Sequence, residues 1–206
     1  MTFPEIVQAR RSIRKFDTEH EFDHNTVKNA LELTILSPNS SNLQTWEFYR
    51  VRSKDKLEKL TKACLNQGAA KTASEMVVFV SRTDLWKRRA DWNASQIKKK
   101  IGERTELTKR EKRSIQYYTV MMWLFYDNTL WPLNSITRKA VLLFRILQGK
   151  PMMRFTRKSD SRIVSNKTLG IAAQTFMLSM KDQGYDTCPM EGFDAVWVRK
   201  ILKLPR

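Results

Sequence analysis

The chain has 206 residues, of which 41% are hydrophobic and 29% charged, and this composition suits a globular domain with a sizeable core. No stretch approaches the ~20 consecutive apolar residues of a membrane span, and the start lacks the basic and apolar regions of a signal peptide, so we expect a cytoplasmic protein without a membrane span. The formal net charge of +17 predicts attraction to anions, and it does not distinguish nucleic acids from small nucleotides.

Helix signals stand near both ends of the chain, with short strand patterns between them. Residues 3–9 are expected to form a helix because a capping box and an early proline mark their start. A second helix is expected to begin at Asp23 or Asn25 and to end at Ser37, since the residue before a proline disfavours helix. The other expected elements are strands over 48–52 and 76–80, and helices over 54–65, between 84 and 126, over 135–148, over 166–183 and from 194 to 202. Many helices with few strands predict an α+β fold.

A polar stretch separates the second helix from the first strand. It runs from Ser37 to Phe48 and gathers hydrogen-bonding side chains around Pro38. Pro, Asn and Ser favour turns through a fixed φ, tolerance of the left-handed region and bonds to their own backbone, so the stretch alone predicts a turn. The side chains concerned are those of Ser37, Asn39, Ser40, Ser41 and Asn42.

A basic cluster follows the first helix. Arg10, Arg11 and Arg14 surround Ser12. A planar guanidinium makes bidentate hydrogen bonds to phosphate and a hydroxyl can add another, so the cluster could clamp an anion. By itself the cluster is equally typical of a solvated basic turn.

Two well-known signatures are disfavoured. The stretch from His20 to His24 spells the zinc-protease pattern His-Glu-x-x-His, which needs both histidines on one helix face; the helix signals begin only at Asp23, so we expect no metal site. The glycines are never spaced as in a dinucleotide-binding fingerprint or a phosphate-binding P-loop. Cys64 and Cys188 lie far apart in the chain, and neither a disulfide framework nor a zinc site is indicated.

Three segments, taken in this order, resemble the nitroreductase family of flavin enzymes. They are Arg10 to Phe16, Ser37 to Phe48, and the stretch from Gly170 to Asp194 that ends in Cys-Pro-Met-Glu-Gly-Phe-Asp. The resemblance implies a single nitroreductase-like domain over residues 1–206, with a central antiparallel-type sheet flanked by helices. The segment around 83–165 matches no family motif and is expected to form a variable helical insertion.

The resemblance also implies FMN, bound at the interface of a homodimer. In the family a basic cluster holds the FMN phosphate, while a polar Pro-containing loop, an asparagine and a late loop line the isoalloxazine ring, partly from the partner subunit. The sequence ends at Arg206, where family members usually continue into a strand that crosses to the partner's sheet. The residues that match the cofactor-binding positions are Arg10, Arg11, Ser12, Arg14, Pro38, Asn39, Ser40, Asn42, Gln44, Asn66, Pro189, Met190, Glu191 and Gly192.

The implied activity is that of an FMN-dependent oxidoreductase, which passes a hydride from NAD(P)H through flavin N5 to an electron-poor acceptor such as a nitroaromatic or a quinone. Because the flavin carries the redox chemistry, no catalytic side chain and no metal are expected. A second hypothesis keeps FMN but assigns it another reaction, such as dehalogenation or desaturation.

A nucleic-acid-binding protein is the alternative from a different class. The run from Lys98 to Arg113 holds eight Lys or Arg residues against three Glu. Acidic residues interrupt this run, and Trp92 is the only nearby aromatic residue, which makes a poor stacking platform and disfavours nucleic acid as a partner.

Overall fold

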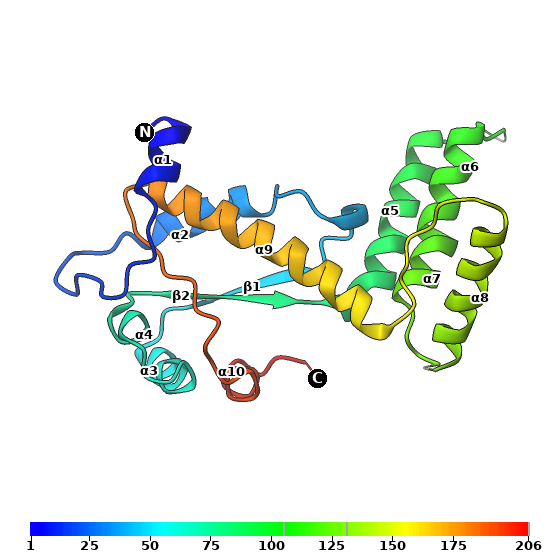
Figure 1. The fold of residues 1–206 in the computed structure, drawn as a ribbon. Helices are drawn as coiled ribbons and strands as arrows, with labels where there is room; N and C mark the ends of the chain where they lie inside the picture. Colours follow the sequence, from blue (N-terminus) through cyan, green and yellow to red (C-terminus); the bar gives the residue numbers. More distant parts are fainter. Residues whose placement is uncertain (105, 131, 206) are drawn as a thin grey trace. The chain divides into compact units, whose positions relative to one another are not determined.

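The chain is organised as two compact units. The computed structural model, drawn in Figure 1, describes residues 1–104, 106–130 and 132–205. The first unit contains residues 1–37, residues 48–80 and the chain from residue 171 onwards, and the second contains residues 38–47 and 81–170. Most of the second unit is the segment in which the sequence predicts an insertion. The organisation as a single domain with an insertion stays a prediction.

The first unit combines a pair of strands with several helices. The two strands, β1 and β2, form an antiparallel hydrogen-bonded pair, so the predicted α+β class is confirmed. Its elements are α1 (Phe3–Ala9), α2 (His24–Thr34), β1 (Trp46–Val51), α3 (Lys54–Ala63), α4 (Gly68–Thr72), β2 (Met76–Ser81), the C-terminal part of α9 (Lys158–Asp182) and α10 (Ala195–Leu202).

Strand β2 lies between two hydrophobic cores. Successive side chains of a strand point to opposite faces. The apolar side chains of the run Met-Val-Val-Phe therefore lie on both faces of β2. Met76 and Val78 pack with residues of α3, α4 and α10, whereas Val77 and Phe79 pack with residues of α2 and α9. Figure 1 shows these two groups of helices on opposite sides of the strands. A strand that is apolar on both faces is therefore explained by helices on both faces.

Acidic and hydroxyl side chains cap the helices as the sequence predicts. Asp23 precedes α2 and its carboxylate accepts a hydrogen bond from the Asn25 backbone N–H at 2.9 Å. Asp194 does the same for α10, accepting from the backbone N–H groups of Val196 and Trp197 at 2.8 and 3.0 Å. These caps satisfy N–H groups that have no partner within the helix.

The second unit is almost entirely helical in its described residues, as predicted for 84–126. Its core consists of Leu43, Ala90, Met122, Phe125 and Tyr126, all buried. The elements are the 3₁₀ turns η1 (Ser40–Asn42) and η2 (Thr83–Leu85), the helices α5 (Trp86–Ile101), α6 (Lys109–Gln116), α7 (Met122–Tyr126) and α8 (Leu133–Leu147), the π-helical turn η3 (Tyr117–Met121) and the N-terminal part of α9.

Helix α9 begins at Lys158, eight residues before the predicted start. The face that its first half buries carries Ser161, Ser165 and Thr168 instead of large apolar residues. Apolar periodicity does not reveal a buried helix face made of serine and threonine. The prediction therefore missed the first two turns of α9. The second half buries Ala172, Phe176 and Met180.

Two smaller predictions also differ from the structure. The helix expected over 54–65 ends at Ala63, because Leu65 and Asn66 adopt left-handed backbone conformations with φ of 58° and 55°. The short helix α4, which starts directly after this turn, was not predicted. The strand expected over 48–52 is shifted and spans 46–51.

Helix α8 carries its apolar stripe on an exposed face. Ile136, Phe144 and Leu147 are 60%, 61% and 77% exposed, while the buried positions are Ser135 and Arg138. The Arg138 guanidinium donates from Nε to the Leu124 carbonyl at 2.6 Å, which explains how a cation can be buried there. Among the described residues, no helix has the length and apolar character needed to cross a lipid bilayer.

Candidate functional site

The basic cluster after α1 is fixed through its backbone. Ser12 forms a parallel bridge with Thr187, and the Ile13 backbone N–H donates to the Thr187 carbonyl at 3.2 Å. Slightly further on, the Phe16 backbone N–H donates to Thr72 Oγ1 in α4 at 2.9 Å. The segment that carries the arginines is thus held at two points within the first unit.

The arginine side chains of this cluster carry charges that no acidic partner among the described residues compensates. Arg11 and Arg14 are exposed and Arg10 is half-buried. Within the described part of the chain, none of the three forms an ion pair with an acidic residue, and Arg11 Nη1 donates only to the Arg10 carbonyl, at 3.0 Å. Exposed cations without carboxylate partners can bind an anionic group from solution.

Asn66 lies in the turn between α3 and α4, next to the late loop. Its left-handed conformation is held by a hydrogen bond from its backbone N–H to the Thr61 carbonyl at 2.9 Å. The following residue, Gln67, donates from Nε2 to the Gly192 carbonyl at 2.6 Å. The side chain of Asn66 itself is exposed. The turn and the Pro189 to Gly192 loop therefore lie against each other.

Gly68 brings the arginine cluster against the same turn. A Cβ atom added at this glycine would lie 2.9 Å from the Arg14 carbonyl oxygen, which is closer than side chains tolerate. The backbone of Arg14 thus passes directly over the first residue of α4. Only a residue without a side chain permits this approach.

The late loop from Thr187 to Gly192 is anchored at both ends. Thr187 pairs with Ser12, and after the loop the Asp194 backbone N–H donates to the Ala63 carbonyl at 2.8 Å. Between these anchors Met190 packs against the core of the first unit, while Glu191 and Gly192 are exposed. Thr187 Oγ1 is buried and has no hydrogen-bond partner among the described residues. The loop is thus positioned while much of its surface stays open to a ligand.

The polar loop that the sequence singles out belongs to the second unit from Pro38 onwards. Three of its residues, Ser41, Asn42 and Gln44, have positive φ angles of 58°, 50° and 46°. Non-glycine residues rarely adopt this conformation, and clusters of them are found at ligand-binding sites more often than elsewhere. Leu43, between them, is 1% exposed and anchors the loop in the core. The turn predicted here is confirmed.

Hydrogen bonds hold the conformation of this polar loop. Asn39 Oδ1 accepts from the Gln44 backbone N–H at 2.8 Å, an Asn-turn bond of the predicted kind. Asn93 of α5 donates to the Asn42 carbonyl at 2.9 Å. The hydroxyls of Ser41 and Tyr117 lie 2.6 Å apart. Burial raises the pKa of Tyr126, which lies near Ser40 and stays protonated at neutral pH.

The structure therefore gathers the predicted site residues into two sets. Within the first unit, hydrogen bonds and close packing connect the basic cluster, the Asn66 turn and the late loop. The polar loop forms the second set, inside the second unit. Their roles toward a cofactor stay predictions. The first set is Arg10, Arg11, Ser12, Arg14, Asn66, Pro189, Met190, Glu191 and Gly192, and the second is Pro38, Asn39, Ser40, Asn42 and Gln44.

Sequence reasoning overlooked several residues that build these sets. Gln67 and Thr187 link the late loop to the other segments of the first unit, and Tyr117 and Asn93 hold the polar loop. The available signal was closeness in the sequence, since Gln67 follows Asn66 and Thr187 stands two residues before Pro189. Nothing in the sequence pairs Tyr117 with a serine 76 positions earlier.

Comparison with known proteins assigns the chain to a family. The sequence profile of the Nitroreductase family matches residues 7–206. An oxygen-insensitive NADPH nitroreductase of Helicobacter pylori is 32% identical over 200 residues, which cover 97% of this chain and 78% of the relative. Protein DrgA of a Synechocystis strain is 25% identical over 205 residues, covering 99% of this chain and 77% of the relative.

Solved structures show the same fold. A nitroreductase-like protein from Streptococcus mutans has a TM-score of 0.64 at 19% identity, over 98% of this chain and 82% of the other. An Exiguobacterium sibiricum protein, provisionally described as a nitroreductase and solved in complex with FMN, has a TM-score of 0.66 at 21% identity, over 100% of this chain and 82% of the other. The family match over nearly the whole chain and the shared fold agree, and the chain belongs to the nitroreductase family.

Proposed function

We propose that this protein is an FMN-dependent oxidoreductase that passes a hydride from NAD(P)H to an electron-poor acceptor such as a nitroaromatic or a quinone. Membership of the nitroreductase family supports the proposal, as does the description of the H. pylori relative as an NADPH nitroreductase. The E. sibiricum structure, which contains FMN, supports the choice of cofactor.

The observation that carries the proposal is the pairing of Ser12 with Thr187. It joins two of the segments that resemble cofactor-binding segments of the family although they lie about 175 residues apart in the chain. The bond from Gln67 to Gly192 adds the Asn66 turn to the same group. Three segments that are distant from one another in the sequence thus lie together in the first unit. The residues of one binding site must lie together in this way.

The donor groups present fit the phosphate end of FMN. Arg10, Arg11 and Arg14 offer guanidinium groups that have no acidic partner in the described part of the chain, and the exposed Ser12 adds a hydroxyl. Charge-assisted bonds from guanidinium to phosphate are the strong class of hydrogen bond, and the planar fork suits phosphate geometry. In the proposed enzyme this cluster binds the phosphate and fixes one end of the cofactor.

The remaining residues fit the ring end. Bound FMN supplies the hydride chemistry, so the protein needs only to position the isoalloxazine ring and to adjust its redox properties through hydrogen bonds. Asn66 presents an exposed amide that can both donate and accept at a heterocycle edge. The loop from Pro189 to Gly192, in which Pro189, Glu191 and Gly192 are exposed, offers a surface for the ring to lie against. The polar loop from Pro38 to Gln44 contributes further amide and hydroxyl groups, with no side chain that must act as an acid or base.

We propose a homodimer as the functional form. Both units expose large apolar side chains, which in a soluble protein often mark contact surfaces. Leu36 of the first unit is 75% exposed and Leu147 of the second is 77% exposed. A second copy of the chain would cover such surfaces and could contribute residues to the FMN site.

Anaerobic reduction and reoxidation of the FMN-loaded protein test the proposed activity. NADPH or NADH should bleach the flavin absorbance at about 450 nm, and a nitroaromatic or a quinone should restore it over many cycles. Reoxidation by a halogenated substrate alone, with release of halide, would favour dehalogenation instead. Bleaching of the oxidised flavin by a saturated substrate, which loses two hydrogens to it, would favour desaturation. A flavin that neither nucleotide reduces would contradict the proposal.

A further inference from the structure

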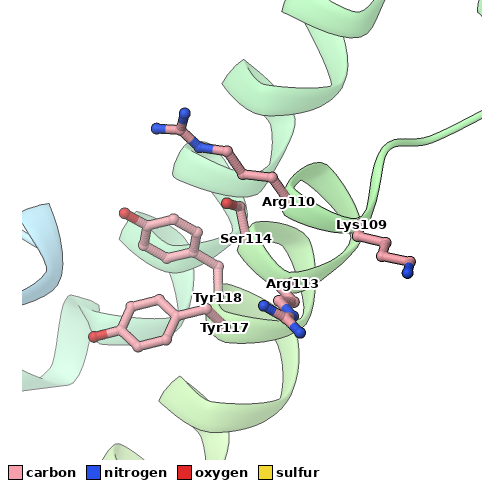
Figure 2. A pocket seen from close by; sticks show the side chains of 6 residues that line it. All are labelled: Lys109, Arg110, Arg113, Ser114, Tyr117 and Tyr118. Carbon is pink, nitrogen blue, oxygen red and sulfur yellow. The ribbon is translucent and has the colours of Figure 1, made fainter.

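An open hollow of about 510 Å³ lies beside α6 and η3, wholly inside the second unit. Figure 2 shows Arg110 and both tyrosine rings projecting to the same side of the helix, with the Ser114 hydroxyl between them, while Lys109 projects the other way. The residues that line the hollow are Lys109, Arg110, Arg113, Ser114, Tyr117 and Tyr118.

Helix geometry explains why these residues meet. Arg110, Ser114 and Tyr117 are four and three residues apart, so they follow one another along one face. The helix then widens into the π-helical turn η3, which begins with the two tyrosines. Their rings meet edge to face, with centroids 5.4 Å apart and an interplanar angle of 82°. Single π-helical turns of this kind are frequent at functional sites.

The cationic side chains of the hollow are available to a ligand. Lys109, Arg110 and Arg113 are exposed, and none of them forms an ion pair with an acid in the part of the chain that the structure describes. The nearest acid in sequence, Glu111, is already engaged by Arg104 at 2.7 Å and by the Thr108 backbone N–H at 2.9 Å. The capping box at the start of α6 satisfies the backbone N–H groups of Thr108 and Glu111, so the attraction to anions comes mainly from the side chains.

Two tyrosine rings line the hollow, and packing and a hydrogen bond hold them in place. Tyr117 and Tyr118 are half-buried and pack against the core around Leu43 and Met122. The Tyr117 hydroxyl lies 2.6 Å from Ser41 Oγ, in the polar loop that we propose to line the FMN ring. A ligand in the hollow could therefore contact Tyr117, whose hydroxyl contacts the polar loop of the same unit.

We propose that this hollow binds the phosphorylated adenosine end of NADPH and that the protein consequently prefers NADPH to NADH. The inference rests on the proposed function, since it assigns a place to the hydride donor. The two nucleotides differ only by the 2′-phosphate, and arginine side chains recognise such a group by bidentate hydrogen bonds. Tyrosine rings offer a surface on which the adenine can stack.

Calorimetric binding of two probes tests the proposal without any catalysis. 2′,5′-ADP carries the additional phosphate and 5′-AMP lacks it, so the wild-type protein should bind 2′,5′-ADP about tenfold or more tightly, as expected for one hydrogen-bonded charge pair. The double variant R110Q/R113Q should lose about tenfold in affinity for 2′,5′-ADP. The control K99Q/K100Q removes the same charge from exposed lysines of α5 that do not line the hollow, and it should bind 2′,5′-ADP like the wild type.

Several results would overturn the inference. Equal affinity for the two probes, full affinity in R110Q/R113Q, or an equal loss in K99Q/K100Q would each show that no specific phosphate site exists here. Displacement of 2′,5′-ADP by a much tighter single-stranded oligonucleotide would assign the hollow to nucleic acid instead.

Kinetics separate this inference from the proposed function. In the FMN-loaded protein, kcat/KM should favour NADPH over NADH, and R110Q/R113Q should reduce that preference about tenfold. If both nucleotides reduce the flavin equally well, the hollow has no such role while the proposed function stands. If the protein takes up no FMN, the proposed function fails, and the calorimetry still decides whether the hollow binds the 2′-phosphate.

Discussion

Arg10 and Arg14 belong to the predicted site although they form no ion pair with any residue that the structure describes. Both sit on a backbone segment held by Thr187 and Thr72, so their position is set by the fold, while their charges stay uncompensated by acids among the described residues. Such an arrangement contributes little to the stability of the folded chain. It is explained if the charges serve a bound anion.

Replacing Arg10 and Arg14 together by alanine should weaken FMN binding about a hundredfold, because two charge-assisted hydrogen bonds to phosphate are lost. Flavin fluorescence quenching on titration with FMN measures the change. The matched control is R52A/R199A, which removes two exposed arginines of the first unit that lie outside the predicted site. Equal FMN affinity in R10A/R14A and the wild type would refute the proposed phosphate clamp.

Gly68 offers a test of the close approach beneath the basic cluster. Gly68→Ala should destabilise the protein by about 1–3 kcal/mol, since the new methyl group would lie 2.9 Å from the Arg14 carbonyl oxygen and force the segment to move. FMN affinity should fall as well, because Arg14 shifts. Chemical denaturation and FMN titration measure the two effects.

The control for Gly68 is Gly170→Ala. Gly170 lies within α9, where an added Cβ meets no atom of the described residues within 4 Å apart from the helix's own backbone, so the substitution should stabilise the protein by about 0.4–1 kcal/mol. If the two alanine variants were equally stable, the packing of Arg14 against α4 would not be as described.

At the scale of elements, a buried ion pair ties α2 to the strands of the first unit. The Glu75 side chain is 1% exposed and receives Arg50 Nε at 2.6 Å, and His24 Nδ1 lies 2.8 Å from its other oxygen. The Arg50 Nη2 also donates to the His24 carbonyl at 2.8 Å. The bond to Glu75 raises the pKa of Arg50, which therefore remains charged at every accessible pH.

Arg50→Leu should destabilise the protein by about 3 kcal/mol, because it leaves a buried carboxylate without its main partner. The double variant R50L/E75L should cost less than the sum of the two single changes, as thermal or chemical unfolding can show. Asp55→Ala, which breaks the exposed pair with Lys59 in α3, should cost no more than about 0.5 kcal/mol. Equal losses in R50L and D55A would contradict the assigned role of Glu75.

The elements also show what the sequence could predict. Capping residues and apolar patterns located α1, β2, α10 and the start of α2 well, because local chemistry decides these features. The end of α2 was predicted at Ser37, whereas the helix ends at Thr34. The first half of α9 escaped prediction since its buried face is made of serine and threonine. The site segments could be recognised by residue type, but the bonds between them, such as Gln67 to Gly192, depend on a fold that brings distant parts of the chain together.

Sequence reasoning overlooked the aromatic residues that follow the basic run of the second unit. It counted only Trp92 as an aromatic residue near Lys98 to Arg113, and on that ground it disfavoured nucleic acid as a partner. The fold places Tyr117 and Tyr118 in the hollow lined by Arg110 and Arg113. The spacing of four residues between Arg113 and Tyr117 was the available signal, because it puts both on one face of a helix.

At the scale of the whole molecule, the proposed dimer predicts a mass of two chains in solution. Light scattering after size-exclusion chromatography measures it, and the single-chain mass of 24.3 kDa gives the reference. Because the exposed apolar surfaces would be covered in the dimer, the mass should stay doubled upon dilution into the low micromolar range. A monomer at all concentrations would rule out a cofactor site shared between subunits.

The central claim is that the chain builds an FMN site, and an FMN titration of the purified protein tests it most directly. We predict that the protein is yellow as isolated, or becomes so with FMN, with absorption maxima at about 370 and about 450 nm and about one flavin bound per chain. A colourless protein that takes up no added FMN at micromolar concentrations would contradict the account.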